Sequence, residues 1–198
     1  MREPGAWSTE WTCARHGAVA PLHPTSPPRT ELLTVLGRRA TVPMWVLWPL
    51  PPGWLVSGVA WAGDERTGPR AIAVSCCGPA PLGGPADLVV VSEELGVGLG
   101  AHVAGLPGPD PGPLDGPPEL VVRAGRHRAP VWAVPGAPDR AVYVGEAHAL
   151  WLWLVVWPAQ DAALIVEDAG LADLRVVPVP ADLPVGALPE RVRRAVTR

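Results

Sequence analysis

Cys13 and His16 have the spacing of half a zinc site. They form a Cys-x-x-His turn, and Gly17 follows directly. A closed structural zinc site uses four ligands, and such a turn supplies two of them, while a glycine relieves the tight backbone. The sequence as given contains no second knuckle beside this turn. Two hypotheses stay open: an exposed turn without metal, and half of a site whose other ligands lie elsewhere.

Cys76 and Cys77 are the remaining thiols of the chain. Adjacent residues of a strand point to opposite faces, so these two rarely share one metal ion. A catalytic thiol is one interpretation, but the apolar run around them favours cysteines that pack as small hydrophobic residues. Three cysteines do not form a disulfide framework, which fits a reducing compartment.

Glu146 and His148 are a carboxylate and an imidazole two residues apart. On a strand both side chains face the same way, and a carboxylate can orient an imidazole and raise its basicity, as general-base catalysis requires. Glu93 and Glu94 are two further acids. If the four converge in one cleft, they indicate a small transferase or hydrolase. The alternative is a histidine with a structural hydrogen bond and three acids without a catalytic task.

The glycines at 96, 98, 100 and 105 weakly resemble a dinucleotide-binding turn after a strand. Such a turn presents backbone N–H groups to a pyrophosphate. Glu93 and Glu94 would place negative charge at that position, and no βαβ unit surrounds them. Nucleotide binding is therefore not predicted.

Trp45, Trp48 and Trp54 stand in or next to the proline-rich segment VPMWVLWPLPPGW. A stiff, extended backbone can present aromatic faces to a ligand or a partner, and Trp is common at the centres of binding surfaces. This segment is the predicted binding surface. Most of the ten tryptophans of the chain are expected in the core.

Composition excludes several classes of protein. The net charge is −3, and the sixteen basic residues, all Arg, form no long stripe, which argues against binding to nucleic acid. The most apolar run, residues 147–158, is too short to cross a bilayer, and no signal peptide is visible, so a cytoplasmic protein without a membrane partner is expected.

These residues need elements to position them, and the pattern predicts mainly strands. Short β-like runs at 54–63, 71–77 and 87–94 are joined by connectors too short for crossover helices. Further strands are predicted at 119–124, 129–135, 140–147, 150–157 and 162–168, with a short helix or turn over 96–106.

Two helices are expected near the ends of the chain. The segment 29–40 has apolar residues at helical spacing, with Ser26 or Thr30 as its cap, and 187–198 begins with a proline near its first turn.

The predicted fold class is α+β, with a mainly antiparallel sheet and possibly two similar β-rich halves. Two pairs of similar segments suggest the halves: residues 42–45 resemble residues 129–132, and residues 87–96 resemble residues 163–170. Each such similarity is called an echo below. Residues 1–28 are assigned to a degenerate or truncated zinc knuckle with a proline-rich linker, and 29–198 to one domain.

The motifs WSTEWTCARHGAVAPLHP, VPMWVLWPLPPGW, EELGVGLGA and DRAVYVGEA resemble an uncharacterised Trp/Pro-rich family of actinobacterial proteins. The resemblance implies no established activity, although some relatives carry a phosphotransacetylase label. Similar proteins begin with a C-P-x-C-G knuckle ahead of W-x-C-x-x-H-G, a zinc-ribbon-like pair. Here the first knuckle is missing, and we expect it upstream of Met1.

The sequence thus favours a non-catalytic binding or regulatory module that uses aromatic and Pro/Gly-rich loops to meet a protein or small ligand. The alternative is the small transferase or hydrolase. No cofactor is expected in the chain as given; zinc is expected if the upstream knuckle is restored, with Cys13 and His16 among its ligands.

Overall fold

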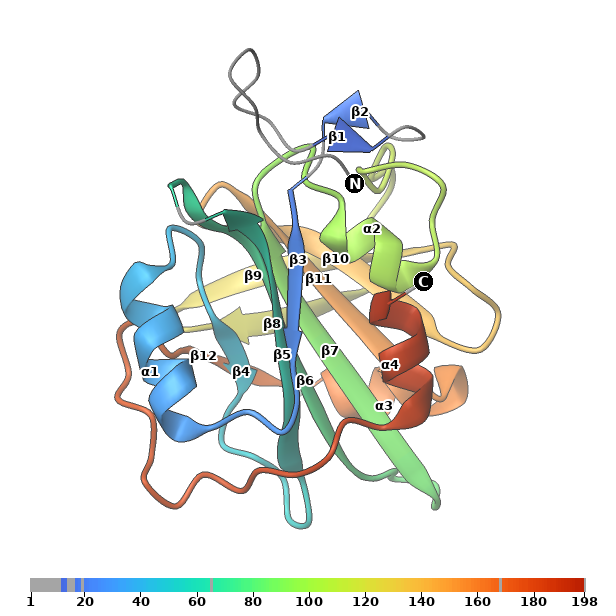
Figure 1. Ribbon diagram of the computed structural model, residues 1–198. Helices are drawn as coiled ribbons and strands as arrows, with labels where there is room; N and C mark the ends of the chain where they lie inside the picture. Colours follow the sequence, from blue (N-terminus) through green and yellow to red (C-terminus); the bar gives the residue numbers. More distant parts are fainter. Residues whose placement is uncertain (1–11, 14–16, 19, 65, 168, 198) are drawn as a thin grey trace.

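The computed structural model describes residues 12–13, 17–18, 20–64, 66–167 and 169–197. Within them, one ten-stranded sheet has the order β3-β5-β6-β7-β11-β10-β9-β8-β12-β4 (Figure 1). Neighbouring strands are antiparallel except β8 and β12, so the predicted mainly antiparallel sheet is confirmed. The strands are β3 (Leu22–Thr25), β4 (Trp45–Leu47), β5 (Leu55–Asp64), β6 (Gly68–Pro79), β7 (Pro85–Glu93), β8 (Leu120–Ala124), β9 (His127–Val134), β10 (Ala141–Ala147), β11 (Leu150–Trp157) and β12 (Gly170–Asp173).

The long central strands are buried on both faces. On β7, Leu88 and Val90 lie in one apolar core, whereas Val89 and Val91 lie in a second. Successive side chains of a strand alternate between faces, so a strand covered on both sides must be apolar at nearly every position. This explains why residues 88–91 form a continuous apolar run.

The inner core lies where the sheet folds over itself, because β4 packs across β6 and β7. Helix α1 (Thr30–Arg39) adds Leu33 and Leu36 to this core. Helices α2 (Leu99–Ala104) and α4 (Glu190–Thr197) cover the outer core, to which they contribute Val103 and Val192. Figure 1 shows α2 and α4 on the same side of the sheet.

The two predicted terminal helices are confirmed as α1 and α4, but the predicted cap of α1 is wrong. Arg29 occupies the capping position and makes no side-chain cap hydrogen bond. Ser26 lies ahead of two prolines, and its hydroxyl donates instead to the carbonyl of Ser57 at 2.9 Å. The proline pair separates this hydroxyl from the helix that it was expected to cap.

The strand predicted at 162–168 is also wrong. Residues 162–166 form helix α3 (Ala162–Val166), which follows a short 3-10 helix, η1 (Ala159–Asp161). Ala162 and Val166 are buried four residues apart, which is the spacing of one helix face. The echo between 87–96 and 163–170 therefore joins a strand to a helix, and two similar halves within the one ten-stranded sheet stay a prediction.

The N-terminal segment contributes to the main sheet. Strand β3 falls within residues 1–28 and pairs with β5, so it forms an edge of the sheet rather than a linker. Ahead of it, β1 (Thr12–Cys13) and β2 (Gly17–Ala18) pair with each other. A domain boundary at residue 28 stays a prediction. Among the described residues, no helix has the length and apolar character that a membrane span requires.

A two-residue turn joins β10 to β11, and both of its residues have a positive φ, 59° at His148 and 60° at Ala149. A β-carbon is strained in this region. Ala149→Gly is therefore expected to raise the free energy of unfolding by about 1 kcal/mol in urea denaturation. The control is Ala163→Gly on the exposed side of α3, which should lower it by about 1 kcal/mol. A loss of stability in both variants would contradict the strain.

Candidate functional site

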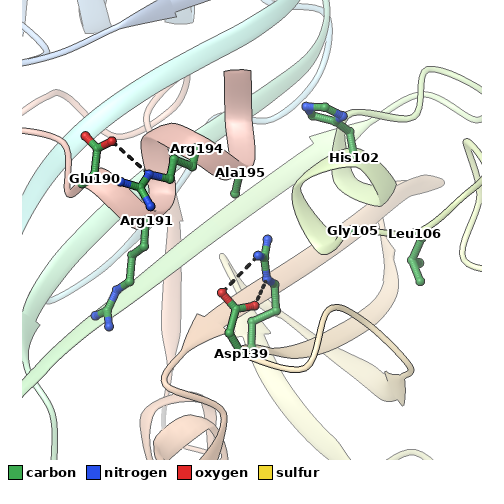
Figure 2. A pocket seen from close by; sticks show the side chains of 9 residues that line it. His102, Gly105, Leu106, Asp139, Glu190, Arg191, Arg194 and Ala195 are labelled. Atoms are coloured by element: carbon green, nitrogen blue, oxygen red, sulfur yellow. Dashed lines mark hydrogen bonds and ion pairs between the residues drawn. The ribbon is translucent and has the colours of Figure 1, made fainter. Parts of the chain in front are cut away.

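A polar cleft of about 750 Å³ lies between α2, α4 and the loop before β10. Figure 2 shows Glu190, Arg191 and Arg194 on one side, His102 on the other, and Asp139 between them. The cleft is lined by His102, Gly105, Leu106, Asp139, Arg140, Glu190, Arg191, Arg194 and Ala195.

Asp139 and Arg140 form a fixed ion pair at the floor of the cleft. The guanidinium donates two hydrogen bonds to the carboxylate, at 2.7 and 3.2 Å, and one to the carbonyl of Val103 at 2.6 Å. It lies 4.7 Å from the ring centre of the buried Trp157, whose indole N–H also donates to Asp139. The Arg140 hydrogen bonds lower the pKa of Asp139. The pair is thus ionised and rigidly placed.

On the α4 side, Arg191 anchors the helix to the sheet. Its guanidinium pairs with the buried carboxylate of Asp87 on β7 and donates to the carbonyl of Pro85 at 2.9 Å. Burial raises the pKa of Asp87, while the hydrogen bond from Arg191 opposes that rise. Arg194, one turn further, pairs with Glu190 at 3.0 Å on the exposed surface.

On the α2 side, a buried carboxylate fixes the helix that carries His102. Glu93 at the end of β7 accepts hydrogen bonds from the backbone N–H groups of Leu99, at 2.7 Å, and Gly100, at 3.2 Å. Burial raises the pKa of Glu93 to about 7. A β-carbon at Gly100 would collide with the indole of Trp153, so glycine lets α2 lie directly on the sheet.

The cleft can bind an anion. Each of the three guanidinium groups on its walls pairs with one carboxylate, so an anion binds through the N–H donors that these pairs leave over. Each guanidinium has five N–H donors. Among the described residues, Arg194 uses one of its five, the Nε–H, which donates to Glu190. The Arg140 guanidinium is held in position before a ligand arrives, because it bonds to Asp139 and to the carbonyl of Val103.

The structure places the predicted acids apart from this cleft. Glu93 is sealed beneath α2, and Glu94 pairs with Arg70 at 2.7 Å. Glu146 pairs across strands with Trp151, which in turn pairs with Glu93. The backbones of Glu146 and Glu93 are therefore two strand spacings, or about 9 to 10 Å, apart.

His148, in the β10–β11 turn, stacks on Trp45 and meets His127 edge-on, with ring centres 5.7 and 5.4 Å away. None of the four predicted catalytic residues lines the polar cleft.

Of the three tryptophans in the predicted binding surface, Trp48 is the exposed one. It is 36% exposed, whereas Trp45 and Trp54 are 2% and 6% exposed. Trp45 belongs to β4 in the inner core, and Trp54 donates its indole N–H to the carbonyl of Pro79 at 3.2 Å. Trp45 is covered because the sheet folds over β4, and the indole of Trp54, just ahead of β5, lies against Gly78 of β6.

Of the predicted zinc ligands, His16 lies outside the described residues, and Cys13 is described only as part of β1. Among the residues that the structure describes, no group of three or more His, Cys, Asp or Glu side chains is placed to hold a metal ion. Cys76 is buried in the inner core, as a packing role predicts, and Cys77 is half-buried.

Sequence reasoning missed the residues that line the cleft. One available signal was the amphipathic C-terminal segment, in which Glu190, Arg191 and Arg194 share one helix face. Nothing in the spacing of the sequence connects that face to His102 or to Asp139, because the cleft forms only when two helices and a loop meet on one sheet.

Comparison with known protein families matches residues 1–192 to a family described as being of unknown function. Neither the curated proteins nor the solved structures contain a significant match to the chain.

Proposed function

Since the chain belongs to this family of unknown function, DUF6758, we propose from the cleft itself that the protein is a non-catalytic binding module for a small anionic molecule. The ligand carries a phosphate or carboxylate group that meets Arg194 and Arg140 between α2 and α4. A volume of about 750 Å³ lies within the range of small-molecule sites.

One observation carries the proposal: guanidinium groups from segments about fifty residues apart converge on one cleft. Arg140 comes from the loop before β10, while Arg191 and Arg194 come from α4. Arginine recognises phosphate and carboxylate through paired N–H donors. His102 adds a further donor on the opposite wall, where it can bind a second polar group of the ligand.

The proposal is tested by calorimetric titration of the full chain with inorganic phosphate and with succinate at low ionic strength. Both probes should bind saturably, and Arg194→Ala should weaken both by about tenfold, the value of one charge-assisted hydrogen bond. Arg194 suits this test because its side chain is 64% exposed and its removal leaves the core intact.

Arg38→Ala is the matched control, since Arg38 is also an exposed arginine near the end of a helix but lies on α1, away from the cleft. It should leave both affinities unchanged, and glycerol, a neutral probe, should not bind. Equal affinities in the wild type and the Arg194 variant, or no saturable binding of either anion, would contradict the proposal.

Trp48 extends this proposal to a partner. It is the exposed member of the predicted aromatic segment, and a protein that binds the module is expected to contact it there. We place this function in the cytoplasm, without nucleic acid or membrane as partner, as the composition predicts. Zinc bound by Cys13, His16 and an upstream knuckle stays part of the proposal, as does the alternative of a small transferase or hydrolase.

A further inference from the structure

A second cavity lies on the opposite face of α4. Its volume is about 220 Å³, and it is partly open to solvent, between α4, β3 and the outer face of β5, β6 and β7. Leu188, Val192 and Val196 form its roof. The remaining lining residues are Pro24, Thr25, Ser26, Gly58, Val59, Ala60, Ala73, Ser75, Val89 and Arg193.

The cavity exists because the sheet beneath α4 carries small side chains. Gly58 and Ala60 on β5 face it together with Ala73 on β6, while the valines of α4 are short. Protein interiors are normally filled to crystal-like density, with few voids larger than a water molecule. A lined space of this size is therefore suited to a ligand.

Its interior is apolar, because the polar groups around it already bond to one another. The Ser26 hydroxyl donates to the Ser57 carbonyl and accepts from the backbone N–H of Leu188, both at 2.9 Å. The Ser57 and Ser75 hydroxyls pair at 2.8 Å. An engineered apolar cavity of about 150 Å³ stays dry and takes up benzene, so hydrocarbon is the chemistry that this cavity accepts.

Arg193 is the charged residue among those that line the cavity. It forms an exposed ion pair with Glu190 at 3.1 Å and donates to the carbonyl of Leu188. Exposed ion pairs of neighbouring helix residues contribute little to stability, so an anionic group of a ligand can exchange with Glu190. The apolar interior and this rim together fit an amphipathic ligand.

We propose that this cavity binds a short fatty carboxylate, with its hydrocarbon chain beneath α4 and its carboxylate beside Arg193. At a packing density of about 0.74, 220 Å³ accommodates a chain of about eight carbon atoms. The site is separate from the polar cleft, because Val192 and Val196 line the one and Glu190 and Arg194 line the other, on opposite faces of the same helix.

The test is calorimetric titration of the full chain with octanoate, with butanoate and hexadecanoate as length controls. Octanoate should bind at least about tenfold more tightly than butanoate, because each buried methylene contributes to binding, and hexadecanoate should bind more weakly because its chain exceeds the cavity. Octanol should bind the wild type and Arg193→Gln equally, whereas the variant should weaken octanoate binding alone.

Ala73→Leu fills the cavity and should abolish octanoate binding while the melting temperature stays the same or rises. Ala60→Val fills it by a smaller amount and decides the matter if the larger variant does not fold. Octanoate affinity that is unchanged in a folded filling variant, no binding of octanoate, or no preference for its length would each overturn the proposal. Arg38→Ala, on α1 and away from both sites, should leave octanoate binding intact.

Discussion

Replacing Arg191 by alanine should lower the free energy of unfolding by about 3 to 5 kcal/mol, the cost of leaving one member of a buried ion pair without its partner. The Asp87 carboxylate, 1% exposed, lies on β7 and has Arg191 as its partner among the described residues. Burial already raises its pKa, and loss of the guanidinium removes the hydrogen bond that opposes this rise. Urea denaturation monitored by tryptophan fluorescence provides the measurement.

Two further variants distinguish the loss of the Asp87–Arg191 ion pair from the general effect of a substitution on α4. Arg194→Ala, which removes an exposed pair on the same helix, should cost less than about 1 kcal/mol. The double variant Asp87→Leu/Arg191→Met should recover most of the loss, because apolar residues of similar volume can replace a buried ion pair without great cost. Equal losses in the Arg191 and Arg194 variants would show that the buried carboxylate is not the cause.

The second large effect concerns Glu93 and depends on pH. Burial raises the pKa of this carboxyl to about 7 from its ordinary value of 4.5. The folded state therefore binds the proton more tightly than the unfolded state does. The stabilisation from that proton is complete below about pH 4.5 and is lost as pH rises through about 7.

Glu93→Gln should remove this dependence, because an amide has the shape of the protonated acid and its oxygen can still accept from Leu99 and Gly100. The variant's free energy of unfolding, relative to the wild type, should rise by about 3 kcal/mol between pH 5 and pH 9. Urea denaturation across this range provides the measurement, and the rise should level off above about pH 7.

Glu94→Gln is the matched control, since Glu94 is the neighbouring residue but lies partly exposed in an ion pair with Arg70. Its pH profile should follow that of the wild type. The contradicting outcome is a difference in free energy of unfolding, between the Glu93 variant and the wild type, that stays constant with pH. The folded carboxyl would then be ionised throughout this range, and its burial would not raise its pKa.

Much of the secondary structure was predictable because it depends on local pattern. The runs at 71–77 and 87–94 contain the continuous apolar stretches 71–74 and 88–91 with turn residues nearby, and they form β6 and β7. The segment 162–168 was predicted incorrectly because a short apolar run fits a strand or a helix equally well. In the structure, Ala162 and Val166 are buried on one face, which a helix allows, and the segment forms α3.

The site was less predictable, because burial is a property of the whole fold. The sequence places Trp45 and Trp48 in one stiff segment, yet the fold covers the first and exposes the second. Glu93 was predicted as one of four catalytic candidates, together with Glu94, Glu146 and His148. The structure instead uses it to hold the first residues of α2, and only its position under that helix raises its pKa.

By itself, the sequence determined the fold class, with its mainly antiparallel sheet, and most of the strands. The hydrophobic periodicity and the short connectors leave few strand arrangements open. It also located the two terminal helices. Only the tertiary structure decided which distant charged residues meet, since Asp87 and Arg191 pair although they are 104 residues apart in the sequence. The Cys13 and His16 half-site, with which the chain begins, stays a prediction, and the polar cleft and the apolar cavity arise where α4 lies across the sheet.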